Sequence, residues 1–395
     1  MLWSKRLHSG RLGLRIGAYA AVAGVLGVGA CVSVASPRGG TGNVPVVRGQ
    51  YKNGRDQIVR IALATAAREG ADLGSGKGPL VVRPEANSPF VLWGGKRYRG
   101  ELVITATDSG MLVVNRLAMD DYLRGVVPLE IGNRTVAEVA AVQAQAVAAR
   151  TYAYKHLNDA RAFDMYSTVQ DQVYGGVDAE KPQADTAIMT TADVVVLYNG
   201  QPITTPYHST CGGSTAAVSE VWYNQSDEPY LRPVSDRIPG SDHFYCDPSP
   251  RFSWTQSFDG PGLRAVMEKY LAAYTNAPKA GVGRITDIRE QGRTPSGRVA
   301  ALTVQTDSGT YTLRGNDIRF VLRDPKGAIL NSTFFSFTRD TNGGEVSSLT
   351  VNGRGYGHGI GMCQWGAIGR ARAGQNYRTI LETYYPGTTI GRIGG

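Results

Sequence analysis

Two short segments carry a histidine and a cysteine at the same spacing. His208 is followed by Cys211, and His243 is followed by Cys246. Together they offer two nitrogen and two sulfur ligands, a set that suits a closed, tetrahedral zinc site of structural type. A Cys211–Cys246 disulfide, which is common in exported proteins, and a pair of unrelated core cysteines are the alternatives. The pattern therefore predicts structural zinc held by His208, Cys211, His243 and Cys246.

A second candidate lies in the run from Gly353 to Gly361, which has glycine at every second position and leads into Cys363 and Gln364. Glycine loses more conformational freedom on folding than any other residue, so such a run indicates close approach of the backbone to another segment or to a ligand. His358 and Cys363 offer a nucleophilic dyad, but no third residue that would orient the histidine can be identified. The preferred interpretation is that His358 and Gln364 bind a ligand or position another catalytic group.

Four ordered blocks resemble the stage II sporulation protein D family, which also includes the amidase enhancers. The glycine-rich run and the residues after it resemble the C-terminal signature of that family, and three further blocks lie upstream. The resemblance covers roughly residues 55–391 and implies a protein that acts on peptidoglycan in the cell envelope. The blocks comprise residues 121–130, 143–153, 207–222 and 353–388.

The resemblance places the functional glutamate of the family at Glu130. We expect this residue on a loop ahead of the next helix, where apolar neighbours raise its pKa toward the range of a general acid; a surface carboxylate near the helix dipole is the alternative. Family members often continue Glu-Met-Pro, whereas this chain has Glu130-Ile131-Gly132. The missing proline is expected to loosen the loop.

One glutamate suffices for a lytic transglycosylase, whereas ordinary glycoside hydrolysis uses two carboxylates. The single acid protonates the glycosidic oxygen and then takes a proton from the 6-hydroxyl of the sugar as a 1,6-anhydro ring closes. Asp120, Asp121 and Asp171 are possible partner carboxylates that the sequence does not rank. We therefore prefer the mechanism with one acid.

The resemblance also suggests a substrate-binding set around Glu130. Arg150 and Tyr154 are spaced to lie on one side of the signature helix and are expected to face outward, with a surface ion pair as the alternative role of Arg150. The other members fall in the two C-terminal blocks. The predicted set is Arg150, Tyr207, Ser209, Thr210, Tyr356, His358 and Gln364.

The N-terminus is typical of an export signal. Four basic residues precede an uncharged apolar run over residues 16–30, which is shorter than the ~20 residues that span a bilayer. The run ends in small residues before Cys31 and resembles a lipobox. Cys31 is therefore predicted to be lipidated, anchoring a bacterial lipoprotein to the membrane. Cleavage by the ordinary signal peptidase and retention of the segment as an anchor are the alternatives.

The chain is mildly cationic. It has 42 Lys and Arg against 33 Asp and Glu, a net charge of +9. The four basic residues of the signal have no acidic counterpart there, so nine less four leaves +5 after processing. This charge suits an anionic cell wall or lipid surface. The basic residues are scattered without a run of five, so the sequence does not indicate nucleic-acid binding.

The hydrophobic pattern predicts an α+β fold with a strand-rich core, because strands and helices segregate rather than alternate regularly. The clearest helix spans residues 135–157, is rich in alanine and begins with a capping box of Thr135 and Glu138. A helix at 262–274 and three strand-like runs after it predict a smaller inserted α/β lobe near 250–330. Other expected strands are 58–64, 80–83, 102–107 and 111–118.

The predicted organisation is an export signal over residues 1–31, a linker over 32–54 and one family domain over 55–391. The leading hypothesis is a lytic transglycosylase that cleaves peptidoglycan glycan strands, with Glu130 as acid and then base. One rival is a non-catalytic peptidoglycan-binding enhancer of a cell-wall amidase. The other is a zinc amidase that cuts the bond between glycan and peptide.

Overall fold

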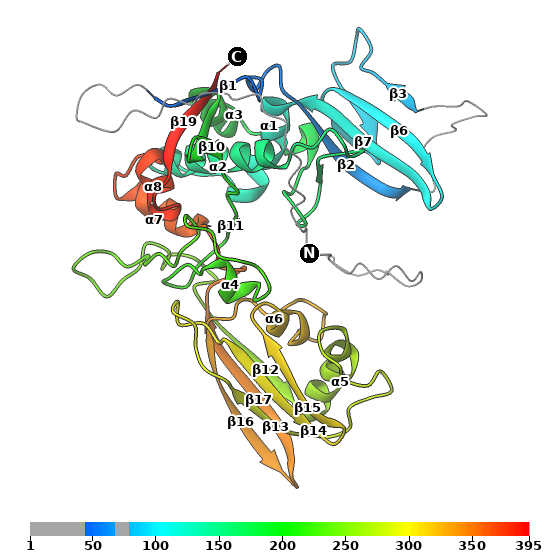
Figure 1. Cartoon of the computed structure of the whole chain (residues 1–395), viewed down its shortest axis with the longest axis vertical. Helices are drawn as coiled ribbons and strands as arrows, with labels where there is room; N and C mark the ends of the chain where they lie inside the picture. The colour runs from blue at the N-terminus through cyan, green and yellow to red at the C-terminus, as the bar shows by residue number, and fades with distance from the viewer. Residues whose placement is uncertain (1–43, 68–78, 395) are drawn as a thin grey trace, which may run out of the picture.

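A computed structural model describes residues 44–67 and 79–394 of the chain. The described residues form a larger body and a smaller lobe, which Figure 1 shows below the body. The predicted export signal and the lipidation residue Cys31 lie outside the described residues. None of the described helices combines the length and the apolar character that crossing a membrane requires.

Among the described residues, the body contains two larger sheets beside two short two-stranded pairs. The first has the strand order β1-β19-β9-β10, and β1 pairs with β19 in parallel while β19 and β10 pair with β9 antiparallel. The second has the order β3-β6-β7-β2-β8. The strands of the first are Val46–Arg48, Thr389–Gly394, Val194–Tyr198 and Gln201–Pro202. Those of the second are Leu80–Val82, Glu101–Thr107, Gly110–Ala118, Ile58–Ala67 and Met165–Tyr166.

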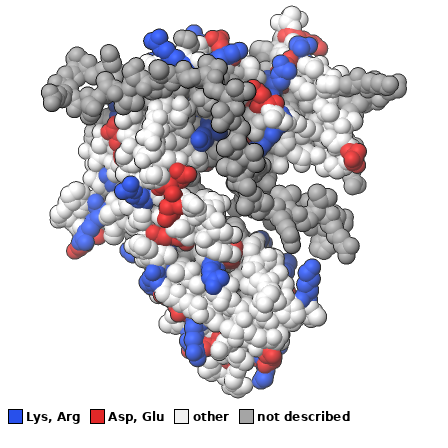
Figure 2. Space-filling model, viewed as in Figure 1, with Lys and Arg blue, Asp and Glu red and all other residues white. Residues whose placement is uncertain are grey.

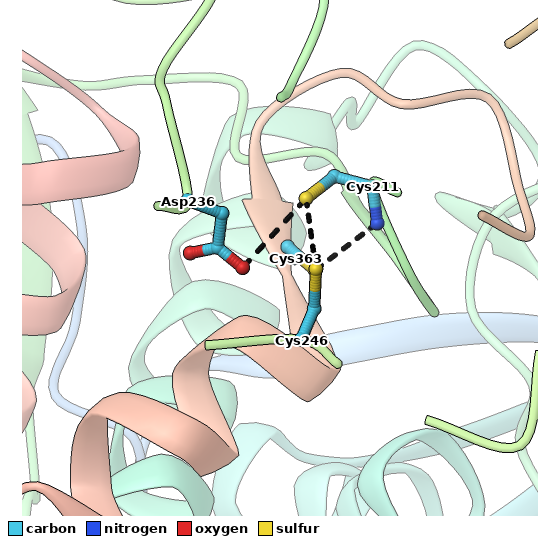
Figure 3. A group of neighbouring side chains, drawn as sticks. All are labelled: Cys211, Asp236, Cys246 and Cys363. Atoms are coloured by element: carbon cyan, nitrogen blue, oxygen red, sulfur yellow. Dashed lines mark hydrogen bonds between the residues drawn. The ribbon is translucent and has the colours of Figure 1, made fainter. Parts of the chain in front are cut away.

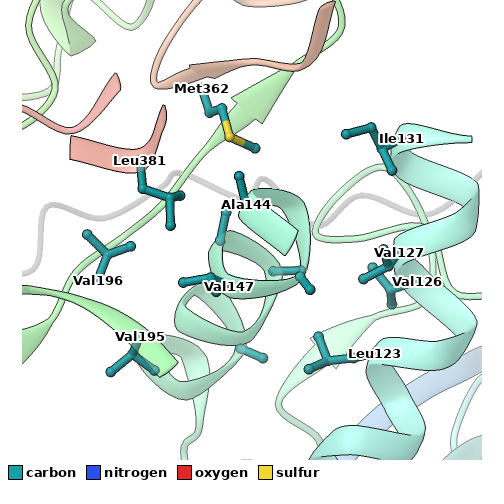
Figure 4. Close-up of a cluster of buried hydrophobic side chains, with 14 of the residues drawn as sticks. Leu123, Val126, Val127, Ile131, Ala144, Val147, Val195, Val196, Met362 and Leu381 are labelled. Atoms are coloured by element: carbon teal, nitrogen blue, oxygen red, sulfur yellow. The ribbon is translucent and has the colours of Figure 1, made fainter. Parts of the chain in front are cut away.

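Helix α2 (Val139–His156) runs through the centre of the body. Apolar and small residues cover it on all sides, as in a helix buried among other elements. It packs against α1 (Met119–Ile131), α3 (Pro182–Thr190), α7 (Gln364–Arg372), α8 (Tyr377–Tyr384) and β9. Figure 4 shows Ala144 and Val147 of α2 between Leu123 and Val127 of α1 on one side and Val195 and Val196 of β9 on the other. The main core thus holds α1 against the C-terminal helices.

The start of this helix agrees with the prediction. A short 3-10 turn, Val136–Glu138, precedes α2, and the Thr135–Glu138 capping box is present. The backbone N–H of Thr135 donates to the Glu138 carboxylate over 2.8 Å. Arg372 of α7 donates to the same carboxylate. The capping box therefore also ties α2 to the helix that follows the glycine-rich run.

The lobe runs from β12 to β17 and has its own core of buried side chains from Phe258 to Val351. One sheet has the order β12-β17-β16 and the other the order β13-β14-β15, and α5 packs on β17. The lobe continues to Arg354, beyond the expected end near 330, because β16 and β17 complete its first sheet. Its elements are Ser253–Asp259, Gly260–Tyr270, Ile285–Glu290, Ala301–Thr306, Gly309–Arg314, Asp317–Val321, Phe335–Asn342 and Glu345–Arg354.

The α+β class is confirmed, and the strands expected near 58, 80, 102 and 111 are present as β2, β3, β6 and β7. Helix α1 was not expected. Its apolar residues Leu123, Val126 and Val127 have helical spacing, but Pro128 lies inside it. A proline in a helix removes one backbone donor, which is why the sequence pattern there did not indicate a helix.

Candidate functional site

The glycine-rich run packs directly on the segment from Pro206 to Gly212. Gly355 and Gly361 have φ of +82° and +70°, and a Cβ on them would lie 2.7 Å from the Thr210 carbonyl oxygen and 2.1 Å from that of Pro206. Short strands β11 (Tyr207–His208) and β18 (Met362–Cys363) pair in parallel where the two segments meet. The predicted close approach is therefore an approach of backbone to backbone, and it brings the two C-terminal blocks together.

Glu130 lies in the last turn of α1, so its predicted place on a loop is wrong. The helix continues through Pro128 to Ile131, and Gly132, with φ of +73°, ends it. The N–H of Gly132 donates to the Pro128 carbonyl over 3.0 Å. This ending directs Glu130 toward β11 and the start of α7.

The Glu130 carboxyl group is largely enclosed by protein. Its Oε1 accepts a hydrogen bond from the backbone N–H of Val173 over 2.9 Å. Burial raises the pKa of Glu130, while the Val173 N–H and the polar side chains of Gln364 and Tyr207 favour the carboxylate and lower the pKa by smaller amounts. The net direction is upward, so this group keeps its proton to higher pH than an exposed glutamate does.

A chain of hydrogen bonds leads to this carboxyl group. The hydroxyl of Tyr122 donates to Oε1 of Gln172, and Nε2 of Gln172 donates to the hydroxyl of Tyr207, each over 3.0 Å. Because the Tyr207 oxygen already accepts a hydrogen bond, its own proton is available to Glu130. Sequence reasoning missed Tyr122, Gln172 and Val173: Tyr122 lies in the 121–130 block but was assigned no role, and no motif marks the other two.

Both ring nitrogens of the half-buried His358 bind backbone. The N–H of Ile360 donates to Nδ1 over 3.0 Å, so the proton resides on Nε2, which donates to the Tyr207 carbonyl over 2.9 Å. Burial lowers the pKa of His358 well below its usual value, which keeps the ring neutral. His358 thus holds Tyr207 in place, and neither ring nitrogen is left free for the predicted contact with substrate.

Gln364, the first residue of α7, is buried, and its Nε2 donates to Oε1 of Gln145 over 3.2 Å. Its side chain also lies beside Glu130, where it lowers the pKa of the carboxyl group. Helices α1, α2 and α7 therefore meet at Glu130. Gln145 is a further polar residue of this group, and the sequence had assigned it no role.

The remaining predicted binding residues differ in how deeply they are buried. Ser209 and Tyr356 are half-buried, and the guanidinium of Arg251 stacks on the Tyr356 ring with its Cζ 4.0 Å from the centroid. Thr210 is buried, and its hydroxyl lies 2.7 Å from that of Ser249, so it braces the loop from within.

Arg150 was predicted to face outward and bind substrate, and that prediction is wrong. Its side chain is 0% exposed and donates to the carbonyls of Ile188, Thr191 and Val194. These acceptors lie at or just after the C-terminal end of α3, where carbonyls lack helical partners. Arg150 therefore secures α3 and β9 to α2. Arg150 does not form a surface ion pair either. Its guanidinium lies 3.8 Å from the Asp120 carboxylate, and the arginine side chain is fully buried.

Asp120 pairs with Arg150, and the two other possible partner carboxylates have different surroundings. Asp121 lies 3.8 Å from Arg99 and 3.9 Å from Arg124, as part of an ion-pair group with Asp185. Asp171 accepts from the Tyr152 hydroxyl over 2.9 Å. Asp171 and Glu130 both raise the pKa of Tyr122, after the larger effect of burial. Of the three candidate carboxylates, Asp171 is thus the one that has Tyr122 as a neighbour in common with Glu130.

A cluster of three cysteines and one aspartate lies under the loop from Pro206 to Gly212. It consists of four buried residues, Cys211, Cys246, Cys363 and Asp236, each of which offers one atom that could bind a metal. These four atoms all lie within 4.8 Å of one another. Figure 3 shows Cys211 joined by dashed lines to the Asp236 carboxylate and to the sulfurs of the other two cysteines. The sulfurs of Cys211 and Cys246 are 3.5 Å apart and not bonded to each other, so the structure does not contain the alternative disulfide.

The four residues predicted to bind zinc do not all come together in the structure. The side chain of His243 is 79% exposed and bonds to Asp247, so it cannot reach the cluster. Cys363 and Asp236 come from elsewhere in the chain to join Cys211 and Cys246. His208 is buried beside Cys211. Its Nδ1 lies 3.1 Å from the Ile360 carbonyl oxygen, and its Nε2 has no hydrogen-bond partner among the described residues.

The cluster carries features of a metal-thiolate site. Cys363 Sγ lies 3.2 Å from the N–H nitrogen of Cys211 and 3.3 Å from that of Gly366, at the N-terminus of α7. Backbone donors and a helix N-terminus favour a thiolate and so oppose the effect of burial, which raises the pKa of the Cys363 thiol. Asp236 accepts from Tyr384 over 2.6 Å and from Arg370 over 3.2 Å. Cys363 is therefore engaged by this cluster and not by His358, which argues against the Cys–His dyad.

The charges of the exposed surface are mixed. Figure 2 shows Lys and Arg interspersed with Asp and Glu over the visible face of both the body and the lobe. On this face the modest positive net charge of the chain does not gather into one large basic area.

Comparisons with known proteins agree with this architecture. The family model described as Stage II sporulation protein matches residues 107–198, and a domain of unknown function (DUF8618) matches residues 238–361. An uncharacterized protein of Brachyspira hyodysenteriae is 33% identical over 309 residues, which cover 78% of this chain and 75% of that protein.

Two relatives in Bacillus subtilis have names that refer to an amidase or to sporulation. The amidase enhancer is 32% identical over 290 residues, and the match covers 68% of this chain but only 40% of the enhancer. Stage II sporulation protein D is 32% identical over 294 residues, covering 70% of this chain and 75% of the relative. This chain therefore belongs to the stage II sporulation protein D family.

Proposed function

We propose that the protein is a lytic transglycosylase of peptidoglycan glycan strands, with Glu130 as the general acid and then the base. The observation that carries the proposal is the carboxyl group of Glu130, whose pKa burial raises. A general acid is most effective when its pKa approaches the working pH. Asp236, whose pKa burial raises to about 8, is a weaker candidate because it faces the cysteine cluster and bonds to Tyr384 and Arg370.

The surroundings of Glu130 suit both halves of such a reaction. In the first, the protonated carboxyl group gives its proton to the glycosidic oxygen as the bond from that oxygen to C1 breaks. The new carboxylate is stabilised by the Val173 N–H and by Gln364 and Tyr207. In the second, the 6-oxygen of the same sugar bonds to C1, and its proton passes to Glu130. The acid is thereby restored, and no water is consumed.

The test is mass spectrometry of the soluble products released from glycan strands by wild type and by Glu130→Gln. Glutamine retains the shape and the acceptor for Val173 but cannot donate an acidic proton. We expect anhydro-ended fragments from the wild type only. Fragments with ordinary reducing ends would contradict the proposal and direct attention to Asp171 as a second carboxylate.

A second candidate function is a non-catalytic enhancer of a cell-wall amidase. The name of the amidase enhancer relative favours it, and none of the names of the matched relatives denotes an enzyme that cleaves glycan. This candidate predicts that both wild type and Glu130→Gln bind glycan, release nothing alone and increase peptide release by an added amidase equally. A stimulation that depends on Glu130 would contradict it.

We also propose that Cys211, Cys246, Cys363 and Asp236 hold a structural zinc ion. Three thiolates and a carboxylate form a donor set that suits zinc. The N–H groups directed at Cys363 and the bonds from Arg370 and Tyr384 to Asp236 would orient the ligands, as outer contacts do in metal sites. Such an ion would brace the 206–212 loop next to Glu130. Because all four ligands are buried protein side chains, this site suits structural support better than the rival zinc amidase.

The proposed cellular location is the envelope, with Cys31 carrying a lipid anchor. The support is the lipobox-like sequence and the family membership. Metabolic labelling with a radioactive fatty acid would detect the anchor in the wild type, and Cys31→Ala would abolish the label. Labelling that persists in the variant would show that Cys31 is not the lipidated residue.

A further inference from the structure

A groove of about 710 Å³ lies at the base of the lobe, where β12 and β17 meet the body. Its lining combines aromatic, basic, amide and hydroxyl side chains: Trp254, Thr255, Arg293, Phe334, Asn352 and Arg354. These residues belong to the segment matched by the domain of unknown function. None of them belongs to the set around Glu130.

Arg354 is the distinctive cation of this groove. It is half-buried, with its Cζ 4.6 Å from the Phe334 ring centroid and 5.8 Å from that of Phe244. Among the described residues, no carboxylate lies within 4.0 Å of its guanidinium nitrogens. Its neighbour Arg293, in contrast, is occupied by Glu290 and by the carbonyls of Gly297 and Phe335. A guanidinium held in place by rings but lacking an acid is prepared for an external anion.

Trp254 gives the groove a fixed aromatic surface. Its indole N–H donates to the Gly355 carbonyl over 2.9 Å, and the ring lies against Gly353, where a Cβ would be 2.1 Å from Cζ2. The lack of a side chain at position 353 thus lets the indole lie on the strand. The ring is only half-buried. Pyranose rings present C–H groups that pack against such aromatic faces.

A second guanidinium lies nearby along the chain. Ser253 is the strand partner of Arg354, and Arg251, two residues before Ser253, stacks on Tyr356 and is exposed. No described carboxylate lies within 4.0 Å of Arg251 either. The end of the β12–β17 pair therefore carries two arginines without an acidic partner, beside an aromatic surface.

This groove is within reach of a strand that is bound at Glu130. Tyr207 lies beside Glu130, and Gly212 lies close to Arg354, because a Cβ added at position 212 would be 2.9 Å from the Cβ of Arg354. Tyr207 and Gly212 are five residues apart, and five residues span at most about 18 Å even when fully extended. A strand of several sugars is long enough to occupy both places at once.

From these contacts we propose that the groove is a remote subsite for an acidic sugar of the same glycan strand. The inference rests on the proposed action on glycan strands. Trp254 would pack on the pyranose, and Arg354 would bind its carboxylate. In peptidoglycan this chemistry belongs to a muramic acid whose lactyl carboxyl group is free rather than joined to a peptide.

The test uses the Glu130→Gln background, so that strands stay intact, and measures the Kd for peptide-free glycan strands by calorimetry. The same strands with their carboxyl groups converted to amides serve as the uncharged ligand. We expect Arg354→Gln to weaken binding of the acidic strands about tenfold and to leave the amidated strands unchanged. Arg314→Gln removes an exposed charge elsewhere in the lobe and is the matched control.

Trp254→Ala is expected to weaken binding of both ligands, and unchanged thermal unfolding of each variant would show that the lobe remains folded. An equal loss on acidic and amidated strands for Arg354→Gln would overturn the carboxylate assignment, as would no loss at all. Strands that retain their peptides are measured alongside, and a loss confined to them would assign the groove to peptide carboxylates and overturn the proposal as stated. Absence of glycan binding by the parent protein would instead refute the proposed function.

Discussion

The backbone N–H of Val173 donates to Oε1 of Glu130 over 2.9 Å, across 43 residues of sequence. This bond joins the end of α1 to the loop that follows β8, and it fixes the direction of a carboxyl group that is otherwise surrounded by helices α1, α2 and α7. Because the bond favours the charged form while burial opposes it, Glu130 can accommodate both protonation states.

The stability of Glu130→Gln relative to the wild type is expected to change with pH. The folded pKa of Glu130 is raised, so the folded protein holds the proton more tightly than the unfolded chain. Below about pH 4.5, the ordinary value, the protonated group imposes no penalty. As pH rises from there to the folded pKa, the wild type loses stability by about 1.4 kcal/mol per pH unit, and the glutamine variant does not. Urea denaturation across pH 4–8 measures the difference, and a constant difference would contradict the raised pKa.

Tyr207→Phe is expected to raise the pKa of Glu130 further. The tyrosine side chain lowers this pKa, and phenylalanine preserves the ring but removes the hydroxyl. NMR titration of the glutamate side-chain carboxyl carbon would follow the change. Tyr223→Phe, which removes an exposed hydroxyl from the loop after α4 (Val218–Val221), is the control. A pKa that falls in Tyr207→Phe would mean that the tyrosine opposes the carboxylate.

Gly361→Ala is expected to destabilise the protein by about 2–5 kcal/mol. A left-handed conformation alone costs an alanine about 1–2 kcal/mol, and crowding adds to it. Position 361 has φ of +70° and a carbonyl oxygen 2.1 Å from the added Cβ, whereas Gly374 has φ of +81° and open space. Gly374→Ala should therefore lose only the first contribution. Equal losses in denaturant unfolding would show that the loop at Pro206 yields without cost.

Arg150→Met is expected to reduce the free energy of unfolding by about 3–5 kcal/mol, because the carbonyls after α3 and the Asp120 carboxylate lose their cationic partner. The Kd of the folded variant for glycan strands should remain that of the wild type. Arg314→Met, at an exposed position, should change neither quantity. A selective loss of glycan affinity without loss of stability would return Arg150 to the binding residues.

Zinc content distinguishes the ligands proposed from the structure, which include Cys363, from those predicted from the sequence, which include His243. Elemental analysis of protein purified without chelators should find about one zinc per chain in the wild type and in His243→Ala, but not in Cys246→Ala or Cys363→Ala. Chelation should lower the Tm of the first two proteins. Retention of zinc by both cysteine variants, or its loss from His243→Ala, would contradict the proposed ligands.

Much of the body was predictable because it depends on local pattern. The alternating strands, the capping box of Thr135 and Glu138, and the close approach of the glycine-rich run all have local signals. The role of Arg150 was not predictable, since an arginine at helical spacing looks the same whether it reaches solvent or the end of another helix. The third sulfur ligand, Cys363, lies 152 residues from Cys211 in the chain. One signal was nevertheless present: the chain has only four cysteines, and three follow the export signal.

The lobe enters and leaves the body through one strand pair, because Ser253 at its start is the partner of Arg354 at its end. Paired residues on antiparallel strands have Cα atoms only about 5 Å apart. The lobe is thus an insertion between two segments of the body whose ends lie close enough for a tight turn to join them. Evolution can lengthen, exchange or remove such an insertion without rethreading the elements around Glu130, so the reach along a polymer and the chemistry performed on it can diverge independently.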